Sequence, residues 1–254
     1  MKIIDFIAIL GALAWLPHLV SLVKYLFIRS KIRIITEQIV QIGFTTYGPI
    51  FNLRLAFAVE RKDIVISHLK IRLQHETGEE RLFEWQGITQ QIGKMTLPNA
   101  DVMPYEKEHS VLAIKLNQKD IEERFVRFQD PNFISLQRDY FDKSDKRMAY
   151  LKNEDKYNPD EFLRAEEMID LYNFNKRAFP WKQGKYTAFV EVTSPEKFSV
   201  VDNVYNFNLS ALDIEKLELN KEFLERDYKR IIIGFKEGDE LINWGWVNPR
   251  LIKK

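Results

Sequence analysis

Apolar residues follow two patterns along this chain: one continuous run near the amino terminus, and alternation with polar residues over much of the remainder. The run extends from Phe6 to Ile28, and no charged residue lies between Asp5 and Lys24. Its 18 uncharged residues would rise about 27 Å as a helix, close to the ~30 Å thickness of bilayer hydrocarbon. The Lys24 side chain would reach the headgroups. The run therefore predicts a single membrane-spanning anchor, with the lipid bilayer as its partner.

Three other interpretations of this run stay open. The small residues Ala12 and Ala14 fit the spacing of a signal-peptide cleavage site. A surface-lying amphipathic helix would need a charged face, which the run does not show. A buried helix of a soluble protein fits the shortness of the run.

The anchor residues Trp15, Pro17 and His18 lie near the middle of the run, and Pro17 and His18 are its irregularities. Pro17 removes a helical amide, so the pattern predicts a kink that membrane helices tolerate. His18 either marks a contact between helices or bonds a carbonyl group freed by the kink.

The flanking charges predict an orientation for the anchor. Lys2 is the one basic side chain before the run. Four basic side chains fall within the ten residues that follow the uncharged stretch 6–23, namely Lys24, Arg29, Lys31 and Arg33. Lysine and arginine near the ends of a span favour the cytoplasmic side, so the domain after the anchor is expected in the cytoplasm. Long domains also translocate regardless of flanking charge, which leaves the opposite orientation open.

Alternation after the anchor predicts a series of short strands. Residues 51–59 are the clearest case, because apolar side chains occupy every odd position. A glycine-containing turn at residues 76–79 is expected to join two strands as a hairpin. The expected strands are residues 31–44, 51–59, 64–75, 82–88, 111–116, 186–193, 198–209, 231–235 and 241–247.

The period changes to that of helices between residues 134 and 176, and Asn158 followed by Pro159 marks a helix start within this region. Ser210 and Asp213 have capping-box spacing and predict another helix as far as Tyr228. The expected fold is mainly β: an antiparallel β-sandwich at residues 31–254, with a helical-hairpin insertion at about 134–176, after an anchor at residues 1–30. The pattern resembles immunoglobulin-like and arrestin-like sandwiches in strand number and alternation alone.

Composition and motifs exclude several kinds of chemistry. The chain has 38 basic and 37 acidic residues, so no overall field attracts nucleic acid, and it has no cysteine for disulfides or thiolate catalysis. Phosphate-binding, dinucleotide-binding, zinc-protease and nucleophile-elbow motifs are all missing from the sequence. His68 and His75 have opposite parity on one expected strand, so they do not predict a shared metal site. We predict no catalytic residue, cofactor or metal.

Aromatic side chains are the remaining candidates for function. Trp244 and Trp246 fall on one face of an expected strand, and Trp181 follows the helical region. These three residues either pack in the core or form a surface for a partner protein. The sequence therefore predicts a single-pass membrane protein whose β-sandwich binds a protein or small ligand. The protein partner is either a different protein or a second copy of this chain. The alternative is a membrane-associated enzyme or nucleotide-sensing effector whose polar site assembles from loops.

Overall fold

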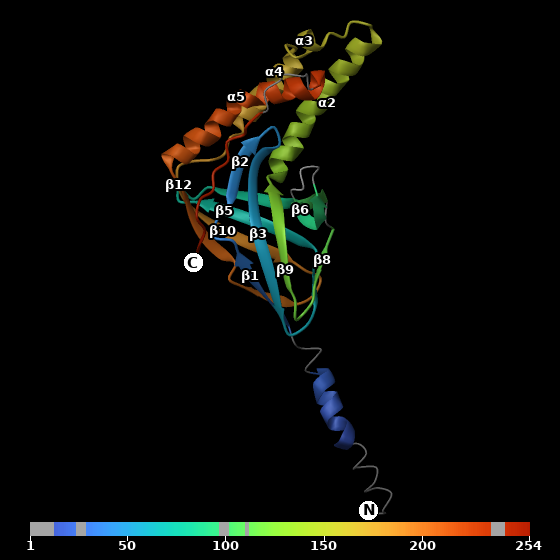
Figure 1. Cartoon of the computed structure of the whole chain (residues 1–254), viewed down its shortest axis with the longest axis vertical. Helices are drawn as coiled ribbons and strands as arrows, with labels where there is room; N and C mark the ends of the chain where they lie inside the picture. The colour runs from blue at the N-terminus through green and yellow to red at the C-terminus, as the bar shows by residue number, and fades with distance from the viewer. Residues whose placement is uncertain (1–12, 24–28, 97–101, 110–111, 235–241) are drawn as a thin grey trace, which may run out of the picture.

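A single curled β-sheet dominates the structure, a computed structural model that describes residues 13–23, 29–96, 102–109, 112–234 and 242–254 (Figure 1). Nine strands follow one another in the order β11-β1-β3-β9-β6-β5-β10-β12-β13, while β2 pairs with β3 and β7 with β6 off this path. The sheet is mixed, because β1 and β11 are parallel and the other pairs are antiparallel. A small second sheet consists of β4 and β8.

The strands in chain order are β1 (Ser30–Thr36), β2 (Gln41–Thr45), β3 (Gly48–Glu60), β4 (Ile64–Ile66), β5 (His68–His75), β6 (Glu80–Thr96), β7 (Val102–His109), β8 (Ile114–Leu116), β9 (Ile121–Gln129), β10 (Gly184–Thr193), β11 (Phe198–Val201), β12 (Val204–Leu209) and β13 (Ile252–Lys253). The helices are α2 (Pro131–Asn153), α3 (Pro159–Phe162), α4 (Glu166–Arg177) and α5 (Ala211–Ile233), besides a helix over residues 13–23. Figure 1 shows α2, α4 and α5 together at one end of the curled sheet.

The predicted two-sheet sandwich is wrong, because the strands on opposite sides of the hydrophobic core belong to one curled sheet. The ring centroids of Phe51 on β3 and Phe207 on β12 lie 5.9 Å apart. These strands are five steps apart in the sheet order, which would be about 24 Å in a flat sheet. Register shifts in β6 between Trp85 and Gly87 mark an irregularity of the kind that bends a sheet. The immunoglobulin-like and arrestin-like resemblance falls with the sandwich.

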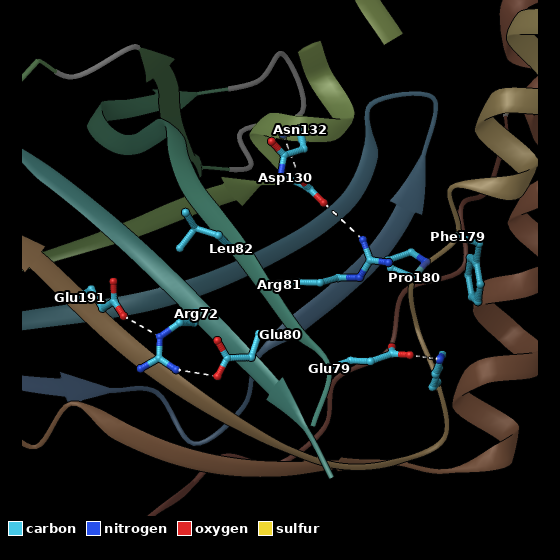
Figure 2. Close-up of a pocket in the computed structure, with 11 residues that line it drawn as sticks. Arg72, Glu79, Glu80, Arg81, Leu82, Asp130, Asn132, Phe179, Pro180 and Glu191 are labelled. Atoms are coloured by element: carbon cyan, nitrogen blue, oxygen red, sulfur yellow. Dashed lines mark hydrogen bonds and ion pairs between the residues drawn. The ribbon is translucent and has the colours of Figure 1, made fainter. Parts of the chain in front are cut away.

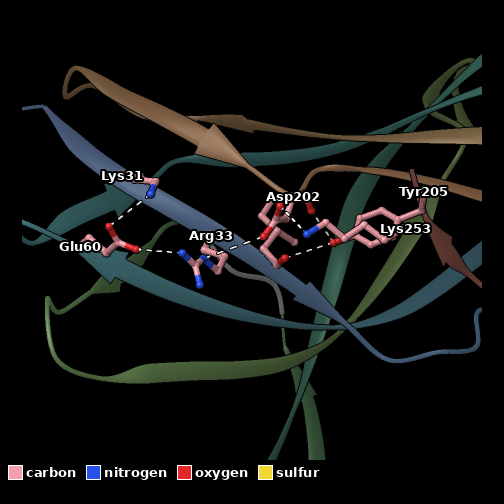
Figure 3. Close-up of polar contacts among 7 residues, drawn as sticks. Lys31, Arg33, Glu60, Asp202, Tyr205 and Lys253 are labelled. Atoms are coloured by element: carbon pink, nitrogen blue, oxygen red, sulfur yellow. Dashed lines mark hydrogen bonds and ion pairs between the residues drawn. The ribbon is translucent and has the colours of Figure 1, made fainter.

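Polar contacts hold the two ends of the curled sheet near one another (Figure 3). Asp202, in the turn between β11 and β12, contacts Arg33 of β1 at 3.9 Å and Lys253 of β13 at 2.6 Å. The hydrogen bond from Lys253 lowers the pKa of Asp202. Tyr205 of β12 donates its hydroxyl to the carbonyl oxygen of Ile34 at 3.1 Å. Side-chain contacts thus link β1, near one end of the sheet order, to β12 and β13 at the other end, where no backbone pairing between these strands is described.

The predicted membrane anchor is also wrong. No helix in the described residues has both the length and the apolar character needed to cross a bilayer. Residues 13–23 form the helix that the structure describes in this run. It contains Trp15, Pro17 and His18, with the Trp15 and His18 rings in edge contact. Phe6, Lys24 and Ile28 lie outside the described residues. The single-pass assignment, the bilayer partner and the cytoplasmic orientation are withdrawn with the anchor.

The expected carboxy-terminal hairpin is replaced by helix and extended chain. Helix α5 continues to Ile233, so the expected strand at residues 231–235 does not form there, and residues 235–241 lie outside the description. The segment after them instead makes isolated bridges from Val247 to Ile42 and from Arg250 to Ile39. Together with β13, these bridges place the segment between β12 and the chain that joins β1 to β2.

The helices share a small core and a buried polar network. Gln137 of α2 donates its amide to the Thr46 carbonyl at 2.6 Å and to the side-chain oxygen of Asn175 in α4 at 2.9 Å. Asn175 donates to the Tyr228 hydroxyl of α5 at 2.8 Å. Burial raises the pKa of Tyr228, so its hydroxyl stays neutral. The network ties three helices to the turn between β2 and β3.

We expect Asn175→Ala to lower the free energy of unfolding by about 1–3 kcal/mol, because the buried Gln137 and Tyr228 groups would each lose one of their hydrogen-bond partners. Urea unfolding followed by circular dichroism measures the loss. The control is Asn173→Ala at an exposed position of the same helix, which should change stability much less. Equal losses would contradict a stabilising role for the network.

Candidate functional site

A polar cleft of about 890 Å³ opens beside the turn between β5 and β6 (Figure 2). Strands β5, β6 and β10 supply one part of its lining, and the start of α2 and the chain after α4 supply the rest. We call it the charged cleft; its lining consists of Arg72, Glu79, Glu80, Arg81, Leu82, Asp130, Asn132, Phe179, Pro180, Lys182 and Glu191.

Strand alternation places Arg72 on the outer face of the sheet. Its neighbours Ile71 and Leu73 are buried in the core, so the side chain between them points the other way. Arg72 donates to Glu191 of β10 at 2.9 Å and to Glu80 of β6 at 3.2 Å. The hydrogen bond with Glu191 is the main cause of the raised pKa of Arg72. The guanidinium is thereby fixed between two carboxylates.

The ring of Phe189 gives this guanidinium a third contact. The central carbon of the Arg72 guanidinium lies 4.2 Å from the ring centroid, within the range of a cation–π interaction. Phe189 is directly opposite Arg72 in the register of β10 and β5. The Arg72 guanidinium is therefore held by the ring of Phe189 and by the carboxylates of Glu80 and Glu191.

A second ion pair connects the cleft to helix α2. Asp130 is the N-cap of this helix and accepts hydrogen bonds from the backbone amides of Asn132 at 2.9 Å and Phe133 at 3.2 Å. The other oxygen of Asp130 lies 3.5 Å from Arg81. The Asp130 carboxylate is nearly buried, whereas Arg81 is half-exposed. Arg81 thus presents a cation to the cleft while its acid partner caps a helix.

A third ion pair lies at the β5–β6 turn. The Lys182 ammonium contacts Glu79 at 2.5 Å, and both side chains are half-exposed. This hydrogen bond is the main cause of the lowered pKa of Glu79. Exposed pairs of this kind contribute little to stability, because solvent screens both charges. Their charges can therefore exchange partners with a ligand at little cost to the fold.

The structure places Trp181 in the core rather than on a surface. Only 3% of Trp181 is exposed; its indole donates to the Gly43 carbonyl at 3.0 Å and stacks on Phe83. Its sequence neighbours Pro180 and Lys182 line the charged cleft. Trp181 thus supports one side of the cleft from beneath.

Trp244 and Trp246 are half-buried in a segment that forms no strand. Trp244 meets the Phe223 ring edge-on at 6.1 Å, and Trp246 lies so close to Gly43 that a Cβ there would be 2.3 Å from its ring. Trp246 and Trp181 therefore both contact Gly43 of β2, away from the residues of the charged cleft. A role for Trp244 and Trp246 in partner binding stays a prediction.

Local sequence patterns predict the charged cleft only in part. Alternation within residues 64–75 puts Arg72 at a polar position of an expected strand, and adjacent acids such as Glu79 and Glu80 are by themselves typical of a solvated surface. Asp130 and Arg81 are 49 residues apart, and no local spacing predicts that they meet. Convergence of these groups depends on the pairing of β5, β6 and β10 and on the position of α2.

The part of the chain that the structure describes contains no group of three or more His, Asp or Glu side chains that could hold a metal ion. His68 contacts Glu84 at 3.5 Å, and His75 hydrogen-bonds Thr77 at 2.9 Å. The chain matches no protein-family model, no curated protein and no solved structure.

Proposed function

We propose that this protein is a binding module, and that the charged cleft recognises an extended segment of a partner protein that carries both acidic and basic side chains. The observation that supports this most is the set of exchangeable ion pairs in one cleft: Arg72 with Glu80 and Glu191, Arg81 with Asp130, and Lys182 with Glu79.

The cleft has the size of a ligand site but not the lining of an apolar pocket. Its volume of about 890 Å³ lies within the ~300–1,000 Å³ typical of ligand pockets. Four carboxylates face three cations, and apolar contact is confined to Leu82, Phe179 and Pro180. Such a surface favours a charged ligand, because charge complementarity excludes partners of the wrong pattern.

The two signs of charge indicate a ligand of mixed charge. A purely anionic ligand would meet Glu80 and Glu191 on either side of Arg72, and a purely cationic ligand would meet the guanidinium itself. A peptide with acidic and basic side chains in alternation pairs with both. The open shape of the cleft admits an extended chain from the side of the β5–β6 turn.

We expect random peptides displayed on phage and selected on the full chain to be enriched in sequences that carry acids and bases together. Synthetic copies of the selected peptides should bind at least about tenfold more weakly to Arg72→Gln/Arg81→Gln, because two charge-assisted contacts are lost. Isothermal titration calorimetry measures the dissociation constants. Binding should also weaken as salt concentration rises.

The matched control is Arg164→Gln/Arg177→Gln, which removes the same charge at exposed positions outside the cleft. Peptides that bind this control and the cleft variant equally would contradict the proposal. The alternative of a nucleotide-sensing effector has its own readout: a nucleotide that raises the melting temperature of the wild type but not of the cleft variant would assign the cleft to that ligand instead.

A further inference from the structure

Another pocket, of about 560 Å³, lies beside β10 and β12, where the carboxy-terminal segment joins the sheet. We call it the edge pocket, defined by Lys185, Thr187, Asn206, Asn208, Arg250 and Ile252. Its outward-facing residues alternate with buried Tyr186 and Phe207, whose rings stack in the core. The pocket is therefore built on the outer face of a rigid part of the sheet.

The charges of the edge pocket are all positive. Lys185 and Arg250 are exposed, and within the described residues neither makes an ion pair. The cations of the neighbouring β1 strand differ, because Lys31 and Arg33 both contact Glu60 (Figure 3). The charged cleft differs in the same way, since each of its cations has a carboxylate partner. Lys185 and Arg250 thus lack the acid partner that Lys31, Arg33 and the cations of the charged cleft have.

The neutral residues of the pocket add hydrogen-bond donors. Thr187 donates its hydroxyl to the side-chain oxygen of Asn206 at 3.0 Å, so the amide nitrogen of Asn206 remains a donor without a partner among the described residues. Asn208 lies two residues further on the same face. Oriented amides beside cations form a setting suited to an anion.

The backbone of β12 is open at the same place. Asn203 accepts from Val190 of β10, so odd-numbered residues of β12 bond in that direction. Val204 accepts from Lys254 on the opposite side, so the backbone groups of even-numbered residues point toward β13. Strand β13 pairs with Tyr205 and Asn206 but does not reach Asn208.

We propose that the edge pocket binds an acidic peptide segment in extended conformation. The segment would continue the β12 ladder at the free N–H and C=O of Asn208, and its carboxylate would pair with Lys185 and Arg250. The exposed side chain of Ile252 lies at the rim and offers an apolar contact. Backbone pairing supplies affinity, and the two cations select an acid. This site shares no residue with the charged cleft.

The test uses a capped peptide of alternating threonine and glutamate, and the same peptide with glutamine in place of glutamate. Titration of the full chain followed by the amide NMR signals of residues 185, 206 and 208 gives the dissociation constants. We expect the acidic peptide, but not the glutamine peptide, to bind the wild type saturably. The acidic peptide should bind the Lys185→Gln/Arg250→Gln variant at least about tenfold more weakly. The Arg72→Gln/Arg81→Gln variant of the charged cleft should bind this peptide as the wild type does.

The matched control is Lys197→Gln/Lys229→Gln, which removes the same charge at exposed positions outside the pocket and should leave binding unchanged. Asn208→Pro removes the outward amide without removing a bond to β10 and should also weaken binding. Equal binding by the pocket variant and the control overturns the proposal. So does equal binding of the glutamine peptide, binding of inorganic phosphate in the absence of peptide binding, or no saturable binding at millimolar peptide.

Discussion

Phe51→Ala should lower the free energy of unfolding by about 3–5 kcal/mol, the range for removing a fully buried phenylalanine. The Phe51 side chain has no exposed surface, and its ring lies 6.2 Å from Phe83 and 5.9 Å from Phe207. Alanine would leave a cavity between strands that lie on opposite walls of the curled sheet. Urea unfolding measures the loss, with exposed Tyr47→Ala as the control that should be nearly neutral.

A double-mutant cycle turns this experiment into a test of the curl. Phe51 and Phe207 lie on strands five steps apart, so their side chains meet only if the sheet bends back on itself. We expect a coupling free energy of about 0.5–1.5 kcal/mol between Phe51→Leu and Phe207→Leu. Additive effects within error would show that the two walls are not in contact.

Gly48→Ala should cost about 3 kcal/mol, from two causes that act together. Gly48 has a φ of +80°, where an L-residue loses about 1–2 kcal/mol, and a Cβ would lie 2.3 Å from the Phe133 ring, an overlap that costs about 1–3 kcal/mol. The substitution strains the turn between β2 and β3 and also displaces Phe133 at the start of α2. Urea unfolding again gives the loss.

Gly78→Ala is the matched control for this prediction. Gly78 has a φ of +89°, but no atom lies within 4 Å of the position that its Cβ would take. Its substitution should therefore show the backbone strain alone, about 1–2 kcal/mol. If both substitutions lower the free energy of unfolding equally, Phe133 does not pack against Gly48. That result would contradict the contact between the β2–β3 turn and α2.

Local patterns predicted the parts of the fold that depend on neighbouring residues. The expected helix starts at Asn158 and at Ser210 are confirmed, because each side chain caps the amides that follow it. Alternation in residues 51–59 correctly assigned the buried side of β3. Such signals work because a cap or a strand face is set within a few residues.

The same kind of reasoning failed for the amino-terminal run and left the position of Trp181 undecided. The run is as hydrophobic as a membrane span, but the helix described within it covers only residues 13–23. Hydrophobicity measures composition, and no helix in the described residues combines the length and the apolar character of a span. For Trp181 the sequence leaves both core packing and a partner surface open, and its burial depends on Gly43 and Phe83, which lie far away in the sequence.

The sequence by itself determined which side of most strands is apolar, where two helices begin, and that no familiar catalytic motif is present. Only the tertiary structure decided that the strands form one curled sheet, that Arg72 meets Glu191, and that Asp130 meets Arg81. The physical reason is that alternation records burial but not the identity of the opposite strand. Strand order and curvature bring distant charges into one cleft, and they arise from the packing of the whole sheet.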